Sequence, residues 1–265
     1  MLQSRGPSCN PFSCEYQRVR LRCAVATRRS QGTPSAPNRP RRKGLFITFE
    51  GIEGSGKSTQ AQALAQYLRD QGFEVVETRE PGGTPVAEHI REVFLRPARK
   101  QRSGDPLVPE CEVALILAAR SQHVANRLLP ALEHGAVVIC DRFSDSTLAY
   151  QGYGRGLPLA ELRSLTRWAA TGLTPDATFL FDLPVSQGLR RRLNSTDVNR
   201  LDHETAAFHQ RVRNGFLSLA QQAPRRIHTI NARRSTQAIA RHLIRLIAPL
   251  LEQGLKKQRL TVTRS

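Results

Sequence analysis

A glycine-rich segment, Gly51 to Ser58, contains the residue types that bind the phosphates of a nucleotide. Four residues separate Gly51 from Gly56, and Lys57 and Ser58 follow directly. In this pattern backbone N–H groups surround the phosphates, the lysine reaches the outer phosphates and the hydroxyl binds Mg²⁺. Glycine is needed because the backbone must approach the anion closely and adopt positive φ. The spacing therefore predicts a phosphate-binding loop, or P-loop.

The sequence on both sides of this loop supports that interpretation. Residues 45–50, LFITFE, have the apolar character of a buried strand. After the loop, apolar residues recur at helical spacing at Ala61, Leu64, Ala65 and Leu68. The helix that they predict ends at Gly72. Because a P-loop lies between a strand and a helix, we prefer this interpretation to an ordinary glycine-rich turn.

Charged residues follow another strand-like segment further along the chain. Residues 136–140, AVVIC, form a continuous apolar run typical of a central parallel strand, and Asp141 and Arg142 come directly after it. P-loop proteins keep the carboxylate on the Mg²⁺ side of their site at the end of such a strand. We therefore predict that Ser58 and Asp141 form the metal side of the site, with Asp141 orienting the waters of the ion.

Strand and helix patterns alternate along the rest of the chain. Strand patterns occupy residues 45–50, 73–79, 136–140, 177–181 and 227–230. Helix patterns follow at about 57–72, 85–95, 110–134, 158–171, 185–192, 203–222 and 235–252. Such alternation implies a parallel sheet with helices on both faces. The predicted fold is α/β, a P-loop NTPase-like five-stranded parallel sheet in one domain over residues 44–253.

Composition limits the class of protein and its environment. The chain has 265 residues, 39% of them hydrophobic and 23% charged, which suits one globular domain. Its apolar runs stay well below 18 residues, so we predict no membrane span. Its five cysteines show neither a disulfide framework nor metal-ligand spacing, which favours a reducing compartment. We expect a cytoplasmic protein.

The formal net charge of +18 is unevenly distributed. Residues 1–43 contain ten basic residues and a single acid, Glu15, so half of the excess lies in this segment. Its Arg-, Ser- and Pro-rich sequence has no periodicity, and we expect a disordered extension. Three interpretations are open: an inert extension or mis-assigned start, a transit peptide for a plastid or other organelle, and an arm that contacts nucleic acid. Residues 254–265 form a short basic C-terminal tail.

Several sequence blocks together resemble the thymidylate kinase family of P-loop nucleoside monophosphate kinases, in its bacterial form. The blocks are Gly51–Ser58, Arg79-Glu-Pro-Gly-Gly-Thr84, Ala119-Arg120, Asp141-Arg142-Phe143, Ser146-Thr147, Ala149-Tyr-Gln-Gly152 and Gly154-Arg-Gly156. They occur in order over nearly the whole body of the chain. The resemblance implies an enzyme that phosphorylates dTMP to dTDP with ATP and Mg²⁺, by in-line transfer, and that forms a homodimer. The partners it implies are thus the two nucleotides.

The resemblance also implies two sets of binding residues. The ATP set is Gly51, Ile52, Glu53, Gly54, Ser55, Gly56, Lys57, Ser58 and Thr59. The dTMP set is Glu53, Arg79, Ile116, Arg120, Arg142, Ser146, Thr147, Tyr150 and Gln151. Glu53 would face the 3′-hydroxyl, Arg79 and Arg142 would bind the dTMP phosphate, and Arg120 would donate to a thymine carbonyl. Tyr150 would close against the sugar where a 2′-hydroxyl would project.

A basic segment at residues 188–202 resembles the lid of these kinases. A mobile basic lid would exclude water and neutralise charge on the phosphates. The catalytic residues expected on this basis are Lys57, Asp141, Arg142, Arg190, Arg191 and Arg192, with Arg200 as a further lid candidate. The chain departs from the family at Leu193 and Ser195, where relatives place arginines, and at Ile116, where they place an aromatic residue that stacks on thymine.

Other functions are compatible with parts of the sequence. The chain could be a kinase for another nucleoside monophosphate or a nucleoside, a regulatory or DNA-associated P-loop ATPase, or a nucleotide-binding relative without turnover. Arg79 and Arg142 argue against the ATPase because a second set of anion-binding groups implies a phosphorylated acceptor. They do not separate dTMP from other monophosphates.

Overall fold

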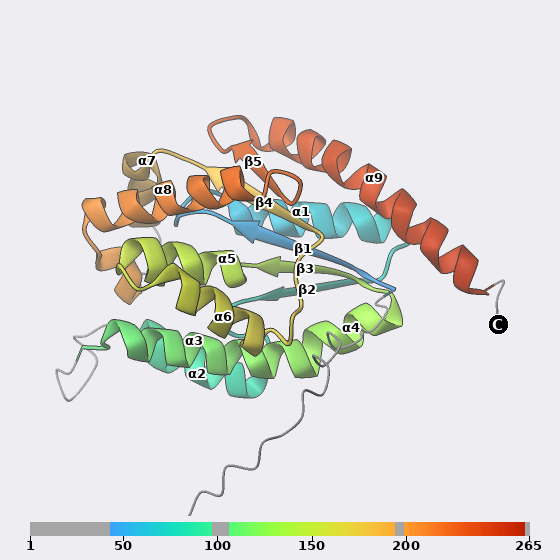
Figure 1. The fold of residues 1–265 in the computed structure, drawn as a ribbon. Coiled ribbons are helices and arrows are strands. Elements are labelled where there is room, and N and C mark those ends of the chain that lie inside the picture. The colour runs from blue at the N-terminus through green and yellow to red at the C-terminus, as the bar shows by residue number, and fades with distance from the viewer. Residues whose placement is uncertain (1–42, 97–105, 194–198, 263–265) are drawn as a thin grey trace, which may run out of the picture. The chain divides into compact units, whose positions relative to one another are not determined.

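The computed structural model describes residues 43–96, 106–193 and 199–262. The predicted extension at residues 1–43 lies outside this part of the chain except for Lys43, as does Ser195 of the lid. Within the described part, five strands form one parallel sheet in the order β2-β3-β1-β4-β5 (Figure 1). The strands are β1 (Leu45–Glu50), β2 (Val75–Arg79), β3 (Val137–Asp141), β4 (Ala177–Asp182) and β5 (Ile227–Asn231). The predicted sheet is confirmed.

The strand register aligns the carboxyl ends of β1, β2 and β3 at one edge of the sheet. Phe49 at the end of β1 pairs with Asp141 at the end of β3, and Asp141 pairs with Arg79 at the end of β2. Because all the strands are parallel, the loops that follow them emerge on the same side. Open parallel sheets bind ligands outside these carboxyl ends, where the strand order reverses.

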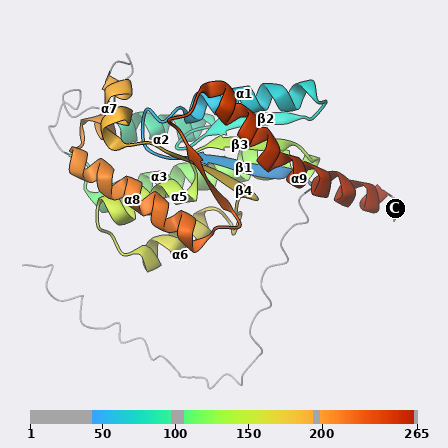
Figure 2. The ribbon, with the colours of Figure 1, turned by 90° about the horizontal axis from the view of Figure 1, so that it is seen from above.

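One face of the sheet is covered by α1 (Lys57–Asp70) and α9 (Thr236–Val262), as Figures 1 and 2 show. The apolar stripe predicted for the first helix faces this core, and Leu64 and Leu68 are buried against Phe49 of β1. The last helix continues to Val262 and so passes the predicted end at residue 252. Its glycine, Gly254, costs roughly 1 kcal/mol in a helix interior, which is too little to force an end.

The other face is covered by a long helical segment and by α6 (Leu159–Ala169) and α8 (Ala206–Gln222). The long segment comprises α3 (Pro109–His123), a π-helical stretch η2 (Val124–Leu128) and α4 (Leu129–His134). The sequence predicted one continuous α-helix here. Pro130 explains the difference, because it lacks the N–H that an α-helix would use at this point.

Two helices complete this layer and the region of the lid. The helix α2 (Pro85–Leu95) packs on α3, and α7 (Val185–Leu193) contains the first described residues of the lid. Residues 144–154, for which the sequence predicted no element, form the short helix α5 (Ser144–Thr147) and a π-helical turn η3 (Leu148–Gly154). No helix in the described part of the chain is long and apolar enough to cross a membrane.

Candidate active site

The segment after β1 adopts the conformation that the glycine spacing predicts. Gly51, Gly54 and Gly56 have φ of 137°, 70° and 89°, values that disfavour other residues. Space also requires glycine at Gly51, where an added Cβ would lie 2.5 Å from the carbonyl oxygen of Phe181. At Gly54 a Cβ would collide with the carbonyl oxygen of Gly188 on α7. The loop therefore packs directly against the start of the lid.

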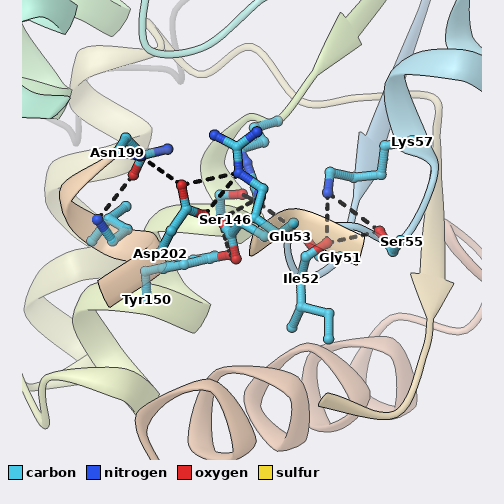
Figure 3. Close-up of polar contacts among 12 residues, drawn as sticks. Gly51, Ile52, Glu53, Ser55, Lys57, Ser146, Tyr150, Asn199 and Asp202 are labelled. Atoms are coloured by element: carbon cyan, nitrogen blue, oxygen red, sulfur yellow. Dashed lines mark hydrogen bonds and ion pairs between the residues drawn. The ribbon is translucent and has the colours of Figure 1, made fainter. Parts of the chain in front are cut away.

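Lys57 lies buried over this loop at the first residue of α1. Its Nζ donates to the carbonyl oxygen of Ile52 at 2.8 Å and to Oγ of Ser55 at 3.3 Å (Figure 3). Burial, followed by the charge of Arg142, lowers the pKa of Lys57 to about 8. A bound polyphosphate would favour the cation and raise this pKa. The ammonium is thus placed for an anion that the loop surrounds.

Ser58, on the first turn of α1, contacts Asp141, the last residue of β3. The Ser58 Oγ donates to Oδ2 of Asp141 at 2.6 Å. The other carboxylate oxygen, Oδ1, is buried and has no hydrogen-bond partner among the described residues. Two adjacent oxygen ligands, one with unused acceptor capacity, are therefore available beside the phosphate loop.

Arg142 has a strained backbone and connects the two sides of the site. Its φ of 72° is unusual for a residue with a side chain. The guanidinium donates to the carbonyl oxygen of Gly51 at 2.9 Å, to Oγ of Ser146 at 3.1 Å and to Oε1 of Glu53 at 2.9 Å. Burial alone would lower the pKa of Arg142, but Tyr150 and Glu53 beside it raise it above its usual value. The group stays cationic.

The Glu53 carboxylate accepts hydrogen bonds from Arg142 and Tyr150 and lies near a histidine of α8. The Tyr150 hydroxyl lies 2.7 and 2.6 Å from its two carboxylate oxygens, and Figure 3 shows the two side chains meeting. His209 of α8 lies 3.8 Å from Oε2. Burial would raise the pKa of Glu53, but the cations of Arg142 and Lys57 hold it below its usual value. The P-loop thus carries an ionised carboxylate that is hydrogen-bonded to Tyr150 and Arg142 and not to Lys57.

Glu50, the last residue of β1, supports the strained turn from behind. Its fully buried carboxylate accepts from the backbone N–H groups of Phe143 (2.8 Å) and Ser146 (3.2 Å) and from the Ser146 hydroxyl (2.5 Å). Burial and then the charge of Asp145 raise the pKa of Glu50 to about 7. We did not predict this role, although an acid at the end of an apolar strand was a visible signal.

A cavity of about 250 Å³ opens beside the loop and extends from Lys57 to the middle of α3. Buried Arg120 lines it from α3 and donates hydrogen bonds to two side chains. Its Nε donates to Oε2 of Glu80 at 2.8 Å and its NH2 to Oγ1 of Thr147 at 3.0 Å. Glu80 also contacts His123 Nδ1 at 3.0 Å. A fixed cation therefore faces the end of the cavity away from the phosphate loop.

A family model described as thymidylate kinase matches residues 49–243, which include every wall of this cavity. The chain belongs to the thymidylate kinase family. The thymidylate kinase of Pseudomonas putida strain GB-1 is 46% identical over 210 residues, 79% of this chain and 98% of the relative. That of Exiguobacterium sp. strain AT1b is 45% identical over 211 residues, 80% of this chain and 97% of the relative.

A solved structure of the thymidylate kinase family has the same fold. The chain aligns with the crystal structure of thymidylate kinase from Ehrlichia chaffeensis at a TM-score of 0.61 and 34% sequence identity. The alignment covers 77% of this chain and 98% of that one. The family predicted from the sequence is therefore confirmed.

Most of the site residues that the family resemblance implies lie together. Those that line the cavity are Glu53, Gly54, Lys57, Ser58, Ile116, Arg120, Asp141, Arg142, Ser146, Thr147, Tyr150, Gln151 and Arg192. Gly51, Ile52, Ser55 and Gly56 complete the loop beside them, and Thr59 lies exposed on the first turn of α1. The fold thus brings together predicted site residues from the P-loop, α3, the end of β3, α5, η3 and α7.

Arg79 does not line the cavity. Its side chain is 54% exposed, and its NH2 donates to Oε2 of Glu88 on α2 at 2.9 Å. Arg91, which was not predicted, lines the cavity instead and donates to the carbonyl oxygen of Pro81 at 2.9 Å. For Arg79 to bind the phosphate of an acceptor, it would have to leave Glu88.

The lid arginines have different surroundings. Arg191 lies 3.5 Å from the carbonyl oxygen of Gly54, and Arg190, the preceding residue of α7, is exposed. Arg192 lines the cavity, and its Nε donates to both carboxylate oxygens of Asp202 at 3.0 Å. Asp202 belongs to the 3₁₀ helix η4 (Arg200–His203), which Asn199 caps (Figure 3). The lid is thus helical at both of its described ends, and residues 194–198 lie outside them.

Arg200 is directed to a buried acid rather than to the phosphate loop. Its NH1 donates to Oε1 of Glu112 at 2.6 Å, and its guanidinium lies over the ring of Phe94. Glu112, Glu80 and His123 were not predicted as functional residues. Glu80 lies inside the Arg79–Thr84 block and could have been found there, whereas Glu112 offered no signal beyond an acid in an apolar helix.

Proposed function

We propose that this chain transfers the γ-phosphoryl group of ATP to dTMP and so forms dTDP. The observation that carries the proposal is the pair of cations beside the Glu53 carboxylate: Arg142 donates to it at 2.9 Å, and Lys57, which lines the same cavity, lies close enough for its charge to lower the pKa of Glu53. Two separate cations at one carboxylate suit two anionic nucleotides that meet there. Membership of the thymidylate kinase family supplies the identity of the acceptor.

Phosphoryl transfer of this kind needs little covalent help from the protein. The residues must hold donor and acceptor in line and stabilise the charge that develops on the transferred group. In this proposal the loop amides and Lys57 hold ATP, and Arg142, fixed by Gly51 and Ser146, contacts the transferred group and the acceptor phosphate. Arg191 and Arg192 approach the phosphates from the lid.

The acceptor would occupy the cavity with its base near α3. Glu53 would accept the 3′-hydroxyl, and Tyr150 would lie under the sugar. Arg120 would donate to a base carbonyl, with Ile116 packed on the base and Ser146, Thr147 and Gln151 around it. An aliphatic Ile116 lacks the ring-on-ring contribution of about 0.5–1.5 kcal/mol that an aromatic residue would add.

We also propose that Mg²⁺ accompanies ATP. Ser58 and the unpartnered Oδ1 of Asp141 are hard oxygen ligands, which Mg²⁺ prefers together with substrate phosphates. The described residues contain no cluster of three or more His, Cys, Asp or Glu side chains, so nucleotide oxygens would complete the set. When bound, Mg²⁺ neutralises charge on the phosphates. Transfer should stop with a chelator and resume when Mg²⁺ is restored.

A coupled assay across dTMP, dUMP, dCMP, UMP and thymidine tests the proposed acceptor. We expect dTMP to give the highest kcat/KM and Lys57→Ala to abolish transfer. Preference for another acceptor would replace dTMP in the proposal. ATP hydrolysis without transfer would instead favour an ATPase, and equal inactivity of wild type and Lys57→Ala would favour a binding protein.

We further propose a homodimer that packs through helices, as the family resemblance implies. Large apolar side chains are exposed on two helices, Val86 and Val93 on α2 and Leu165 and Trp168 on α6. Trp168 is the most exposed of these side chains, at 73%, and exposed apolar side chains that lie together mark association surfaces. Sedimentation equilibrium should give twice the chain mass for wild type and a smaller mass for Trp168→Glu; a monomeric wild type would contradict the proposal.

We infer a cytoplasmic location from the bacterial thymidylate kinases that the chain resembles. Residues 1–43 leave an organelle as the alternative. Fractionation of cells that express the natural chain, with mass spectrometry of its N-terminus, tests both the location and removal of a transit peptide.

A further inference from the structure

Gln151 is a buried residue of the cavity wall with only half of its amide used. It lies on η3, is 1% exposed and lines the cavity. Its Nε2 donates to Oε2 of Glu112 at 3.0 Å. Its Oε1 is buried and has no hydrogen-bond partner among the described residues. A buried carbonyl oxygen without a partner is costly and calls for a donor.

Glu112 decides which end of this amide can face it. The carboxylate, 1% exposed on α3, also accepts from Arg155 at 2.8 Å and from Arg200 at 2.6 Å. Burial would raise the pKa of Glu112, but these hydrogen bonds hold it below its usual value. An ionised carboxylate only accepts hydrogen bonds. The Gln151 amide therefore cannot turn its oxygen toward Glu112 without placing two acceptors together.

Arg120 provides the complementary half of the pattern. Glu80 and Thr147 accept from its Nε and NH2, whereas its NH1 is buried with no hydrogen-bond partner in the described part of the chain. Apart from Oδ1 of Asp141 beside the phosphate loop, the described wall of the cavity thus offers an unused acceptor, Oε1 of Gln151, and an unused donor, NH1 of Arg120. Each is fixed from behind by a buried acid.

We propose that Glu112 is a positioning residue that fixes the Gln151 amide with Oε1 toward the acceptor's base, so that the cavity selects a base with an N–H beside a carbonyl. The inference rests on the proposed function and deepens it. Thymine and uracil offer a ring N3–H next to carbonyl oxygens, which match Gln151 and Arg120. Cytosine offers an unprotonated N3 and an amino group, which oppose both.

The direction of the amide is what gives Glu112 its effect on selectivity. If Gln151 could turn freely, it would accept from thymine and donate to N3 of cytosine equally well. Fixing it makes cytosine leave a buried acceptor without a donor, and sites built in this way discriminate strongly. The 5-methyl group plays no part, so dTMP and dUMP should respond alike to changes at Glu112.

The test is calorimetric binding of dTMP, dUMP and dCMP to full-length wild type and Glu112→Gln, without ATP. An amide at position 112 can donate to Gln151 and allow it to turn. We expect affinity for dTMP and dUMP to fall about tenfold in the variant, the loss of one hydrogen bond, while dCMP binds no more weakly. A dTMP-to-dCMP ratio that is unchanged from wild type would overturn the inference.

Glu204→Gln is the matched control because Glu204 accepts from the same Arg155 at 2.6 Å and has no contact with Gln151. It should leave all three affinities unchanged; an effect equal to that of Glu112→Gln would mean that only the ion cluster matters. If Glu112→Gln does not fold, Gln151→Met decides, since it removes Oε1 and leaves the arginines on Glu112. Gln151→Met should lower the dTMP-to-dCMP ratio about tenfold, and an unchanged ratio would refute the inference.

The two proposals fail in distinguishable ways. Absence of transfer to dTMP by wild type refutes the proposed function, whatever the base preference in binding. Transfer to dTMP with an unchanged dTMP-to-dCMP affinity ratio in Glu112→Gln, or in Gln151→Met where that variant decides, refutes only the further inference.

Discussion

Phosphate binding needs the positive charge of Lys57, but the surroundings of this lysine favour its neutral form. Its ammonium is buried among Arg142, Ile52 and Ser55, and neighbouring acids only partly offset the burial. A lysine with a pKa near physiological pH releases its proton more readily than one in solvent. The charge of Lys57 therefore changes with pH near 8.

We expect the KM for ATP to rise with pH above 8. Because the pKa of Lys57 is lowered to about 8, the cation is the main form below that pH and is lost above it. The KM should increase about tenfold between pH 7 and pH 9, since one pH unit above the pKa leaves about a tenth of the cation. Lys57→Arg stays charged and should show a flat profile; an equal rise in this variant would assign the effect to another group.

Changing Glu53 to Gln should affect the acceptor more than ATP. The carboxylate contacts Arg142 and Tyr150 rather than the Lys57 ammonium. Removing its charge should lower kcat/KM for dTMP by about tenfold or more, the loss of a charged hydrogen bond, with a smaller change in the Kd of ATP. Steady-state kinetics and ATP titration distinguish the two, and a variant weakened only in ATP binding would contradict the assignment.

At the scale of elements, the turn between β3 and α5 needs support from β1. Arg142 lies in the left-handed region, and the backbone N–H groups of Phe143 and Ser146 end at Glu50. Residues held in such conformations persist only when their surroundings fix them. The strand that carries the phosphate loop therefore also fixes the arginine beside it, through one buried acid.

The stability of the fold should fall as pH rises from about 4.5 to 7. The pKa of Glu50 is raised to about 7 in the folded state, so folding favours the protonated form. The free energy of unfolding then declines across this window, by roughly 3 kcal/mol for this group alone, and levels above it. In Glu50→Gln this contribution should be absent. Urea unfolding at several pH values measures both slopes, and identical slopes would show that Glu50 does not titrate here.

At the scale of the whole molecule, the family match and the site both lie within one α/β body. The family model covers residues 49–243, and the described residues that line the cavity fall between Glu53 and Leu201. The boundaries at 43 and 253 remain predictions, as does the role of the basic extension.

Removing residues 1–41 should leave catalysis unchanged. A chain that begins near Arg42 keeps β1 and the loop after it. Because the residues that line the cavity lie between Glu53 and Leu201, kcat and KM for dTMP should stay within about twofold of the values for the full chain. Steady-state assays of the two chains under matched salt give the comparison. A loss of kcat in the shorter chain would give the extension a part in the reaction.

The sequence by itself determined the P-loop, the parallel sheet and the family. These depend on local spacing, such as the four residues between Gly51 and Gly56, and on the period of apolar residues, which adjacent residues fully specify. The elements after β1 and before Pro109 were located for the same reason. The long helix was divided because Pro130 removes one donor, an effect that periodicity does not register.

Only the tertiary structure decided which charged groups meet. Arg79 and Arg91 have the same charge and lie twelve positions apart, yet Arg79 is exposed beside Glu88 and Arg91 lines the cavity. The contacts between Glu50 and Ser146 and between Glu112 and Gln151 join residues 96 and 39 positions apart. No local pattern encodes such pairs, because they form only when packing removes water and a buried polar group must find its partner on another part of the chain.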